Sequence, residues 1–141
     1  MGLIIRAISP ETRSFRGNDS KSPMKKINID PNNWQQLPGY RRNVLLTGAD
    51  LHSPGTRMQM VTMKPGDSIS GHYHKTSHEV YCVLQGQCTL VVDGQEIILR
   101  PGTLLSIEPG DIHHLYNHGS ETFELLVFKT SSTIEDTFWT A

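Results

Sequence analysis

The chain has 141 residues, a length typical of one domain with a modest hydrophobic core. Its formal net charge of −1 at pH 7 gives no reason to expect a nucleic-acid partner. No apolar run is long enough to span a bilayer, and residues 3–5 are too short for the apolar region of a signal peptide. We therefore expect a cytoplasmic protein that binds neither nucleic acid nor membrane.

Residues 1–33 are polar and partly basic, and we interpret them as an N-terminal arm with one short β-prone piece at 3–8. Residues 1–64 carry ten Lys and Arg against four Asp and Glu, whereas residues 65–141 carry three against ten. These opposite charges favour contact between the arm and the rest of the chain, within one molecule or between subunits. Uneven surface composition would give the same counts. We expect the folded domain to cover residues 34–141.

From residue 57 onward, short apolar segments alternate with turn signals. Glycines recur every eight residues from Gly86 to Gly110, Asp93-Gly94 is a strong hairpin signal, and two Pro-Gly pairs mark further turns. We expect strands at residues 80–84, 88–92, 95–99, 103–107, 112–116 and 123–129. This spacing, without any helical period, predicts an all-β antiparallel sandwich or barrel in which hairpins join consecutive strands.

The chain has two cysteines, Cys82 and Cys88. A two-residue turn at 85–86 would pair Cys82 with Thr89 and Val83 with Cys88. Neighbouring strand positions face opposite sides, so the two sulfur atoms would point away from each other. We therefore expect two free thiols that pack as small hydrophobic side chains.

The pattern with the most chemical content is a set of three histidines and one glutamate. His72 and His74 are two residues apart, and alternate residues of a strand share a face, so their imidazoles form a chelating pair. Glu79 follows after a polar turn, and His113 can join them only if the fold brings a distant segment back. Imidazole and carboxylate ligands suit Fe, Mn, Co, Ni, Cu or Zn better than Mg or Ca. These residues predict one site for a divalent transition metal.

The residues around these four also follow a regular pattern. The first stretch reads Gly66-x5-His72-x-His74-x4-Glu79-x6-Gly86, and the second reads Gly102-x7-Gly110-x2-His113-x3-Asn117. Over roughly residues 58–128 they resemble the two motifs of the cupin superfamily. The second motif departs once, because the family usually has proline where this chain has Glu108, one position before Pro109. The resemblance implies a single jelly-roll (double-stranded β-helix) barrel whose metal ligands are His72, His74, Glu79 and His113.

Two of these ligands have neighbours that compete for the same role. Only one of two adjacent strand residues can face inward, so His114 is the alternative to His113, and His78 is the alternative to Glu79. The family positions favour His113 and Glu79. Tyr81 shares a face with Glu79, one layer deeper, where it either contacts the substrate or the ligands or simply fills the barrel.

Four protein ligands on an octahedral metal leave two positions open for water, dioxygen or a chelating substrate. The resemblance then implies a metal-dependent enzyme acting on a small oxygen-bearing substrate, as a dioxygenase, a sugar isomerase or a decarboxylase. The alternative is a non-catalytic barrel that binds a small ligand through the metal. We also expect a homodimer, because several strands are apolar on both faces and one barrel interior can bury only one face.

Overall fold

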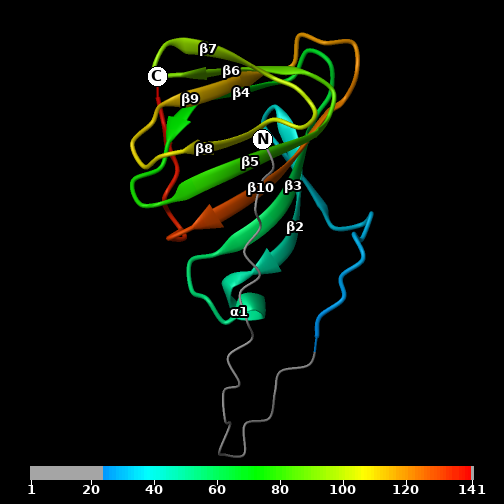
Figure 1. Ribbon diagram of the computed structural model, residues 1–141, viewed down its shortest axis with the longest axis vertical. Coiled ribbons are helices and arrows are strands. Elements are labelled where there is room, and N and C mark those ends of the chain that lie inside the picture. Colours follow the sequence, from blue (N-terminus) through cyan, green and yellow to red (C-terminus); the bar gives the residue numbers. More distant parts are fainter. Residues whose placement is uncertain (1–23, 141) are drawn as a thin grey trace, which may run out of the picture.

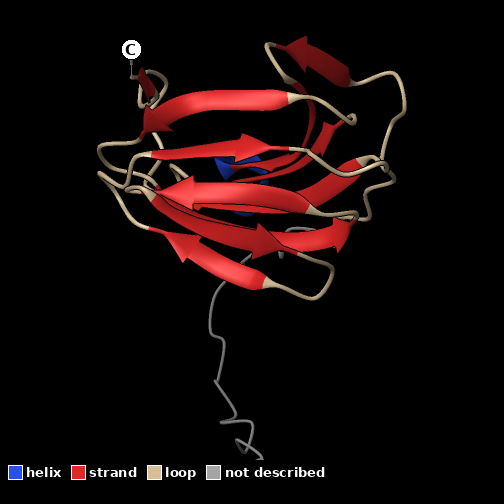
Figure 2. Ribbon diagram, turned by 90° about the horizontal axis from the view of Figure 1, so that it is seen from above, coloured by secondary structure: helices blue, strands red, loops and turns tan. Residues whose placement is uncertain are grey.

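The computed structural model describes residues 24–140, which form eleven strands and one short helix (Figure 1). Figure 2 shows that the secondary structure is almost entirely strand. Most of the predicted arm, with its β-prone piece, lies outside the described residues, so the arm and its boundary stay predictions. Within residues 24–140 no helix is long and apolar enough to cross a membrane. The predicted all-β jelly roll is confirmed.

The larger sheet contains six antiparallel strands in the order β1-β2-β3-β10-β5-β8. Their bounds are Trp34–Leu37 for β1, Tyr40–Thr47 for β2, Arg57–Met63 for β3, Phe123–Thr130 for β10, His78–Gln85 for β5 and Leu104–Ile107 for β8. Among the described residues, the sequence interpretation assigned no strand before residue 57. It missed β1 and β2 because this part of the chain is polar and much of it is only half-buried. A helical turn, α1 at Gly48–Leu51, joins β2 to β3 and is capped by Thr47.

The smaller sheet has the order β11-β4-β9-β6-β7. Its strands are Phe138–Trp139 for β11, Ser68–Tyr73 for β4, His113–Tyr116 for β9, Cys88–Val92 for β6 and Gln95–Leu99 for β7. The hairpin predicted at Asp93-Gly94 joins β6 to β7, with Val92 opposite Gln95. Asp93 has a φ of 47° and Gly94 a φ of 84°, so both residues have the positive φ that a type I′ turn requires.

The chain passes repeatedly between the two sheets, which corrects the predicted succession of hairpins. β5 pairs with β10 and β8, whereas β6 pairs with β7 and β9. The turn at Gly86 (φ 71°) therefore crosses to the other sheet instead of folding back, and it passes so close to Thr122 that a Cβ would lie 2.6 Å from the carbonyl oxygen. Cys82 and Cys88 lie in different sheets, and both are free thiols as predicted.

Large apolar side chains from both sheets meet in the barrel interior. The side chains with almost no exposure include Met63, Leu90, Leu115, Phe123 and Leu125. Burying a side chain of this size stabilises the fold by roughly 1.5–3 kcal/mol. This apolar packing fills one end of the barrel and leaves the other end to polar residues.

Cross-strand register arranges those polar residues in rows on the inner face of the larger sheet. Lys129 on β10 lies opposite Glu79 on β5 and opposite Arg57 on β3. In the next row, Val127 lies opposite both Tyr81 and Gln59. Residues directly opposite each other project to the same face, so the first row places a carboxylate beside two cationic side chains.

Candidate metal centre

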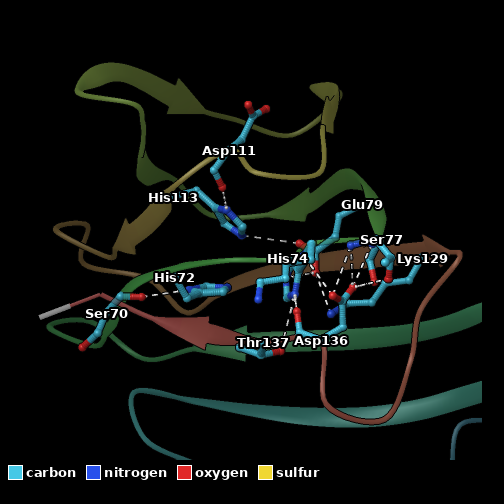
Figure 3. Close-up of polar contacts among 12 residues, drawn as sticks. Ser70, His72, His74, Ser77, Glu79, Asp111, His113, Lys129, Asp136 and Thr137 are labelled. Atoms are coloured by element: carbon cyan, nitrogen blue, oxygen red, sulfur yellow. Dashed lines mark hydrogen bonds and ion pairs between the residues drawn. The ribbon is translucent and has the colours of Figure 1, made fainter.

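Three histidines from two adjacent strands meet at the polar end of the barrel. His72 lies on β4, His74 follows the end of β4, and His113 begins β9 directly opposite His72. One ring nitrogen from each histidine lies within 4.8 Å of the others. The three side chains are at most 7% exposed. Figure 3 shows the rings gathered in one place, so the fold brings the distant segment back as the sequence required.

Each imidazole is oriented by a backbone carbonyl. Nδ1 of His72 lies 2.8 Å from the Ser70 oxygen, Nδ1 of His113 lies 2.9 Å from the Asp111 oxygen, and Nδ1 of His74 lies 2.8 Å from the Asp136 oxygen (Figure 3). A carbonyl can only accept, so each Nδ1 carries the proton and donates. The lone pair of a neutral imidazole is then on Nε2, the atom that remains free to bind a metal.

Glu79 reaches the same place from β5. Its Oε1 lies 2.9 Å from Nε2 of His74, and its Oε2 lies 3.6 Å from Nε2 of His113. On the other side, Nζ of Lys129 lies 2.7 Å from Oε1 of Glu79. Burial alone would raise the pKa of Glu79, but hydrogen bonds from His113 and His74, in the state where these rings carry a second proton, and the charge of Lys129 hold that pKa well below its usual value. Glu79 is therefore an anion at neutral pH.

This donor set fits a metal ion. Nε2 of His74 and Nε2 of His113 are buried and have no hydrogen-bond partner among residues 24–140. With the proton of His74 on Nδ1, its Nε2 lone pair faces a carboxylate oxygen, a repulsive contact that either a second proton or a cation must relieve. Neighbouring ligand atoms in an octahedral site lie about 3 Å apart when the metal–nitrogen bonds are about 2.1 Å. The spacing between His74 and Glu79 agrees with that value.

The competing residues point elsewhere. Glu79 is 3% exposed and faces inward, whereas His78 lies on the outside and pairs with Glu108 at 2.8 Å. His113 is fully buried, whereas His114 lies on the other face of β9, where its ring contacts Tyr116. Each alternation follows from the two-residue period of a strand.

Tyr81 is buried one row deeper than Glu79, with its ring centroid 6.4 Å from that of His113. Burial and the negative charge of Glu79 raise the pKa of Tyr81 well above its usual value, so its phenol is neutral. Tyr81 lines the cavity beside the histidines and also packs in the hydrophobic core.

Two residues of the site escaped the sequence interpretation. Lys129 is 7% exposed and lies in β10, where every second residue is buried. A lysine on the inward face of an apolar strand is a signal for a buried ion pair, and it was available in the sequence. Asp136 gave no such signal, because it belongs to a short polar segment without periodicity.

The side chain of Asp136 fixes the loop between β4 and β5. It accepts hydrogen bonds from the backbone N–H groups of Lys75, Thr76 and Ser77 and from the hydroxyl groups of Thr76 and Ser77. Burial would raise the pKa of Asp136, but the hydrogen bonds, led by that of the Ser77 hydroxyl, lower it well below its ordinary value. Asp136 therefore positions His74 both through its carbonyl and by holding the loop that follows.

The titration of His72 predicts a pH-dependent stability in the metal-free protein. Burial, reinforced by the charge of His113, lowers the pKa of His72 from 6.5 to about 4. As the pH falls through this window, the unfolded chain takes up a proton that the folded chain refuses, so stability is lost. The loss amounts to about 2 kcal/mol between pH 7 and pH 4.5.

Urea unfolding in excess chelator would measure this effect, with His72→Gln as the comparison. The free energy of unfolding of the wild type should fall by about 2 kcal/mol more than that of the variant over the same range. A difference between the two proteins that stays constant with pH would contradict the prediction.

Comparison with known proteins agrees with this geometry. The Cupin domain family model matches residues 59–129, half of the chain. Quercetin 2,3-dioxygenase of Bacillus subtilis is 35% identical over 94 residues, 59% of this chain but only 28% of that protein. An oxalate-binding protein of Thermotoga maritima is 24% identical over 107 residues, 73% of this chain and 88% of that protein.

Solved structures of other proteins share this fold. The crystal structure of a predicted oxalate decarboxylase from Thermotoga maritima superimposes with a TM-score of 0.70 at 18% sequence identity, over 76% of this chain and 99% of the other. At this identity the likeness shows the fold alone. The family match carries the classification, and the sequence motifs and the two-sheet barrel agree with it: the chain belongs to the cupin family.

Proposed function

We propose that His72, His74, Glu79 and His113 bind one divalent transition metal ion, and that the protein is a metal-dependent enzyme acting on a small oxygen-bearing substrate. The observation that carries the proposal is the convergence of three imidazoles, each held by its own carbonyl, with the Glu79 carboxylate beside two of them. Such pre-oriented, buried donors are costly to keep unless a cation satisfies them.

A cavity next to the four residues supplies the place for a substrate. It has a volume of about 80 Å³ and is bordered by His72, His74 and Glu79. Trp139 forms part of its wall, with its ring centroid 5.0 Å from that of His72. A space of this size admits a few water molecules or a small organic molecule.

A transition metal bound here would polarise an oxygen-bearing ligand or activate dioxygen. The chain supplies the remaining functions. Glu79 contributes negative charge, Lys129 partly balances that charge, and the neutral phenol of Tyr81 is a hydrogen-bond donor at the cavity wall. The four candidate ligands are at most 7% exposed, which limits the access of water to the site.

The names of relatives narrow the reaction types to be tested. One curated relative is a dioxygenase, and one structural neighbour is described as a predicted oxalate decarboxylase. A sugar phosphate isomerase from a cupin superfamily in Silicibacter pomeroyi has the same fold at 24% identity, with a TM-score of 0.60 over 72% of this chain and 66% of that one. We therefore keep dioxygenation, decarboxylation and isomerisation as the three reaction types.

The function is tested by elemental analysis of natively purified protein, followed by three assays on metal-loaded and chelated samples. Oxygen uptake would be followed with catechols, flavonols and diketones, carbon dioxide release with small carboxylic acids, and isomerisation with sugar phosphates. We expect turnover in one assay that disappears on chelation and returns with the metal. Metal binding without turnover in any assay would instead support the non-catalytic alternative. One relative is named as an oxalate-binding protein, so oxalate is the first ligand to test in that case.

The expected homodimer remains a prediction, as does the cytoplasmic location. Leu104 on the edge strand β8 is 68% exposed, and Leu84 on β5 is 47% exposed. They belong to the outer face of the larger sheet, which also carries the half-buried side chains of Leu126 and Phe128. A second copy covering this face would remove apolar surface from water at roughly 25 cal/mol per Å².

Sedimentation velocity at micromolar concentration would decide the oligomeric state. The wild type should sediment as a dimer, and Leu104→Glu should shift it toward monomer. Ile98→Glu, which changes an exposed side chain on the smaller sheet, serves as the control and should leave the dimer intact. A wild-type monomer would refute the prediction.

A further inference from the structure

The wall of the cavity opposite the histidines is cationic. Arg42, Arg57 and Lys129 all line the cavity, and Glu79 is the one carboxylate among the described residues that line it. Lys129 already pairs with Glu79 at 2.7 Å. Among residues 24–140, no carboxylate lies within 4.0 Å of either guanidinium group. The cavity therefore carries positive charge that the described part of the protein leaves uncompensated.

Arg57 is the more informative of the two arginines. Its side chain is half-buried, and its Nε is fully buried without a hydrogen-bond partner in the described part of the chain. Burial lowers the pKa of Arg57, and the charge of Arg42 lowers it further. Arginine nevertheless stays protonated in proteins. Two like charges in a partly desolvated cavity are unfavourable, and a bound anion would offset both the repulsion and the missing hydrogen bond.

Gln59 gives a second and independent indication. It lies two residues from Arg57 on β3, so both side chains project to the same face. Gln59 is 5% exposed and lines the cavity, and no described residue forms a hydrogen bond with its Oε1. An unsatisfied buried amide costs about 1–3 kcal/mol. Its two ends are interchangeable by rotation, so the amide N–H groups can be turned toward an acceptor in the cavity.

The sheet register fixes how far this pair lies from the candidate ligands. Arg57 and Glu79 occupy the same row, separated by β10 and Lys129. Neighbouring strands are about 4.8 Å apart, so the two backbones are about 10 Å apart, and the side chains reach toward each other across the cavity. A ligand of a few carbon atoms can span the remaining distance.

We propose that the substrate is a short organic acid whose carboxylate binds to Arg57 and Gln59, while a second oxygen donor at its other end reaches the metal. The second half of this statement rests on the proposed function. A guanidinium group presents two parallel N–H donors that match the two oxygens of a carboxylate, and the Gln59 amide supplies a further donor. Lys129 lies between Arg57 and Glu79 in the same row, and its charge stays paired with Glu79.

Calorimetric titration of the full chain with malonate, succinate and glutarate, each paired with its neutral diamide, tests the proposal at fixed ionic strength. At least one dicarboxylate should bind ten-fold or more tightly than its diamide. In Arg57→Met this preference should fall below three-fold, and Arg57→Lys, which keeps the charge but loses the paired donors, should be intermediate. Gln59→Leu should weaken the acid by a smaller factor than Arg57→Met.

Lys64→Met is the matched control, because it removes one positive charge from an exposed position outside the cavity. It should bind the dicarboxylates within two-fold of the wild type. Arg57→Met should fold normally, since it removes an unpaired charge, and its melting temperature would verify this. The proposal is overturned if the three acids bind no better than their diamides, or if Arg57→Met keeps the wild-type preference.

Metal content measured on the same samples separates this inference from the proposed function. A protein that binds no metal but retains an Arg57-dependent preference for the acids would refute the metal-dependent function and support the anion site. A protein that binds one metal but shows no preference would refute the anion site alone. Chelated wild-type protein should show the preference in weakened form, because Arg57 is not one of the four candidate ligands.

Discussion

Replacing both His72 and His113 with alanine should reduce the metal content from one ion per chain to less than about a tenth of that, as measured by elemental analysis after dialysis. His72 on β4 and His113 on β9 lie directly opposite each other, and the double variant removes two of the four donors at once. Losing a single well-placed ligand already weakens metal sites severely, and the two remaining residues no longer enclose an ion.

The matched control is a second pair of histidines from the same region. His114→Ala/His118→Ala also removes two imidazoles, but these rings contact Tyr116 instead of the cluster. This variant should retain the full metal content. Both double variants should keep the far-ultraviolet circular dichroism of the wild type, because the apolar end of the barrel is untouched. Full metal occupancy in His72→Ala/His113→Ala would refute the assignment of the site.

Removing the Lys129 charge should have opposite effects on the metal-free and metal-bound protein. In excess chelator, Lys129→Met leaves the Glu79 carboxylate buried without its closest cation, which should lower the free energy of unfolding by about 3 kcal/mol. With metal present, the ion itself compensates Glu79. A neighbouring positive charge is also gone, so the apparent metal affinity should rise about ten-fold or more, equivalent to about 1.4 kcal/mol.

Urea unfolding with and without metal, together with competition against a chelator of known affinity, would measure both quantities. Lys129→Arg retains the charge and should change neither by as much as Lys129→Met. Lys64→Met removes an exposed lysine and should behave as the wild type. If metal binding instead weakens in Lys129→Met, Lys129 serves chiefly to hold Glu79 in the orientation that the metal needs.

Much of the barrel followed from local patterns. The strands between residues 80 and 129 were predictable because turn residues and short apolar runs alternate regularly, and the Asp93-Gly94 hairpin was predictable because its positive φ angles need those residue types. The partners of β5 were not. Gly86 permits either a hairpin or a crossing to the other sheet, and only the packing of the whole barrel decides between them.

The candidate site also contains residues that the sequence could predict and residues that it could not. The spacing of His72 and His74 and the inward orientation of Glu79 are consequences of strand periodicity. Lys129 could have been found from its place in an apolar strand. Asp136 could not, since its importance depends on a segment returning to the loop after β4 through contacts some 60 residues apart in sequence. Gln59 and Arg57 become informative only once the structure shows that their buried polar atoms lack hydrogen-bond partners among the described residues.

The orientation of the imidazoles by main-chain oxygens has a consequence for how the site tolerates genetic change. Substitution at Ser70 or Asp111 replaces a side chain but leaves the carbonyl that accepts from the histidine two residues later. Alanine scanning would therefore not detect the carbonyl anchors themselves, because they persist whatever the side chain is. Two of the anchors also have a side-chain role. The Asp136 carboxylate holds the loop after β4, and the Asp111 carboxylate accepts a hydrogen bond from the backbone N–H of Glu108. A saturation screen should accordingly find position 136 the least tolerant, position 111 intermediate and position 70 permissive, even though the carbonyl of each accepts from an imidazole.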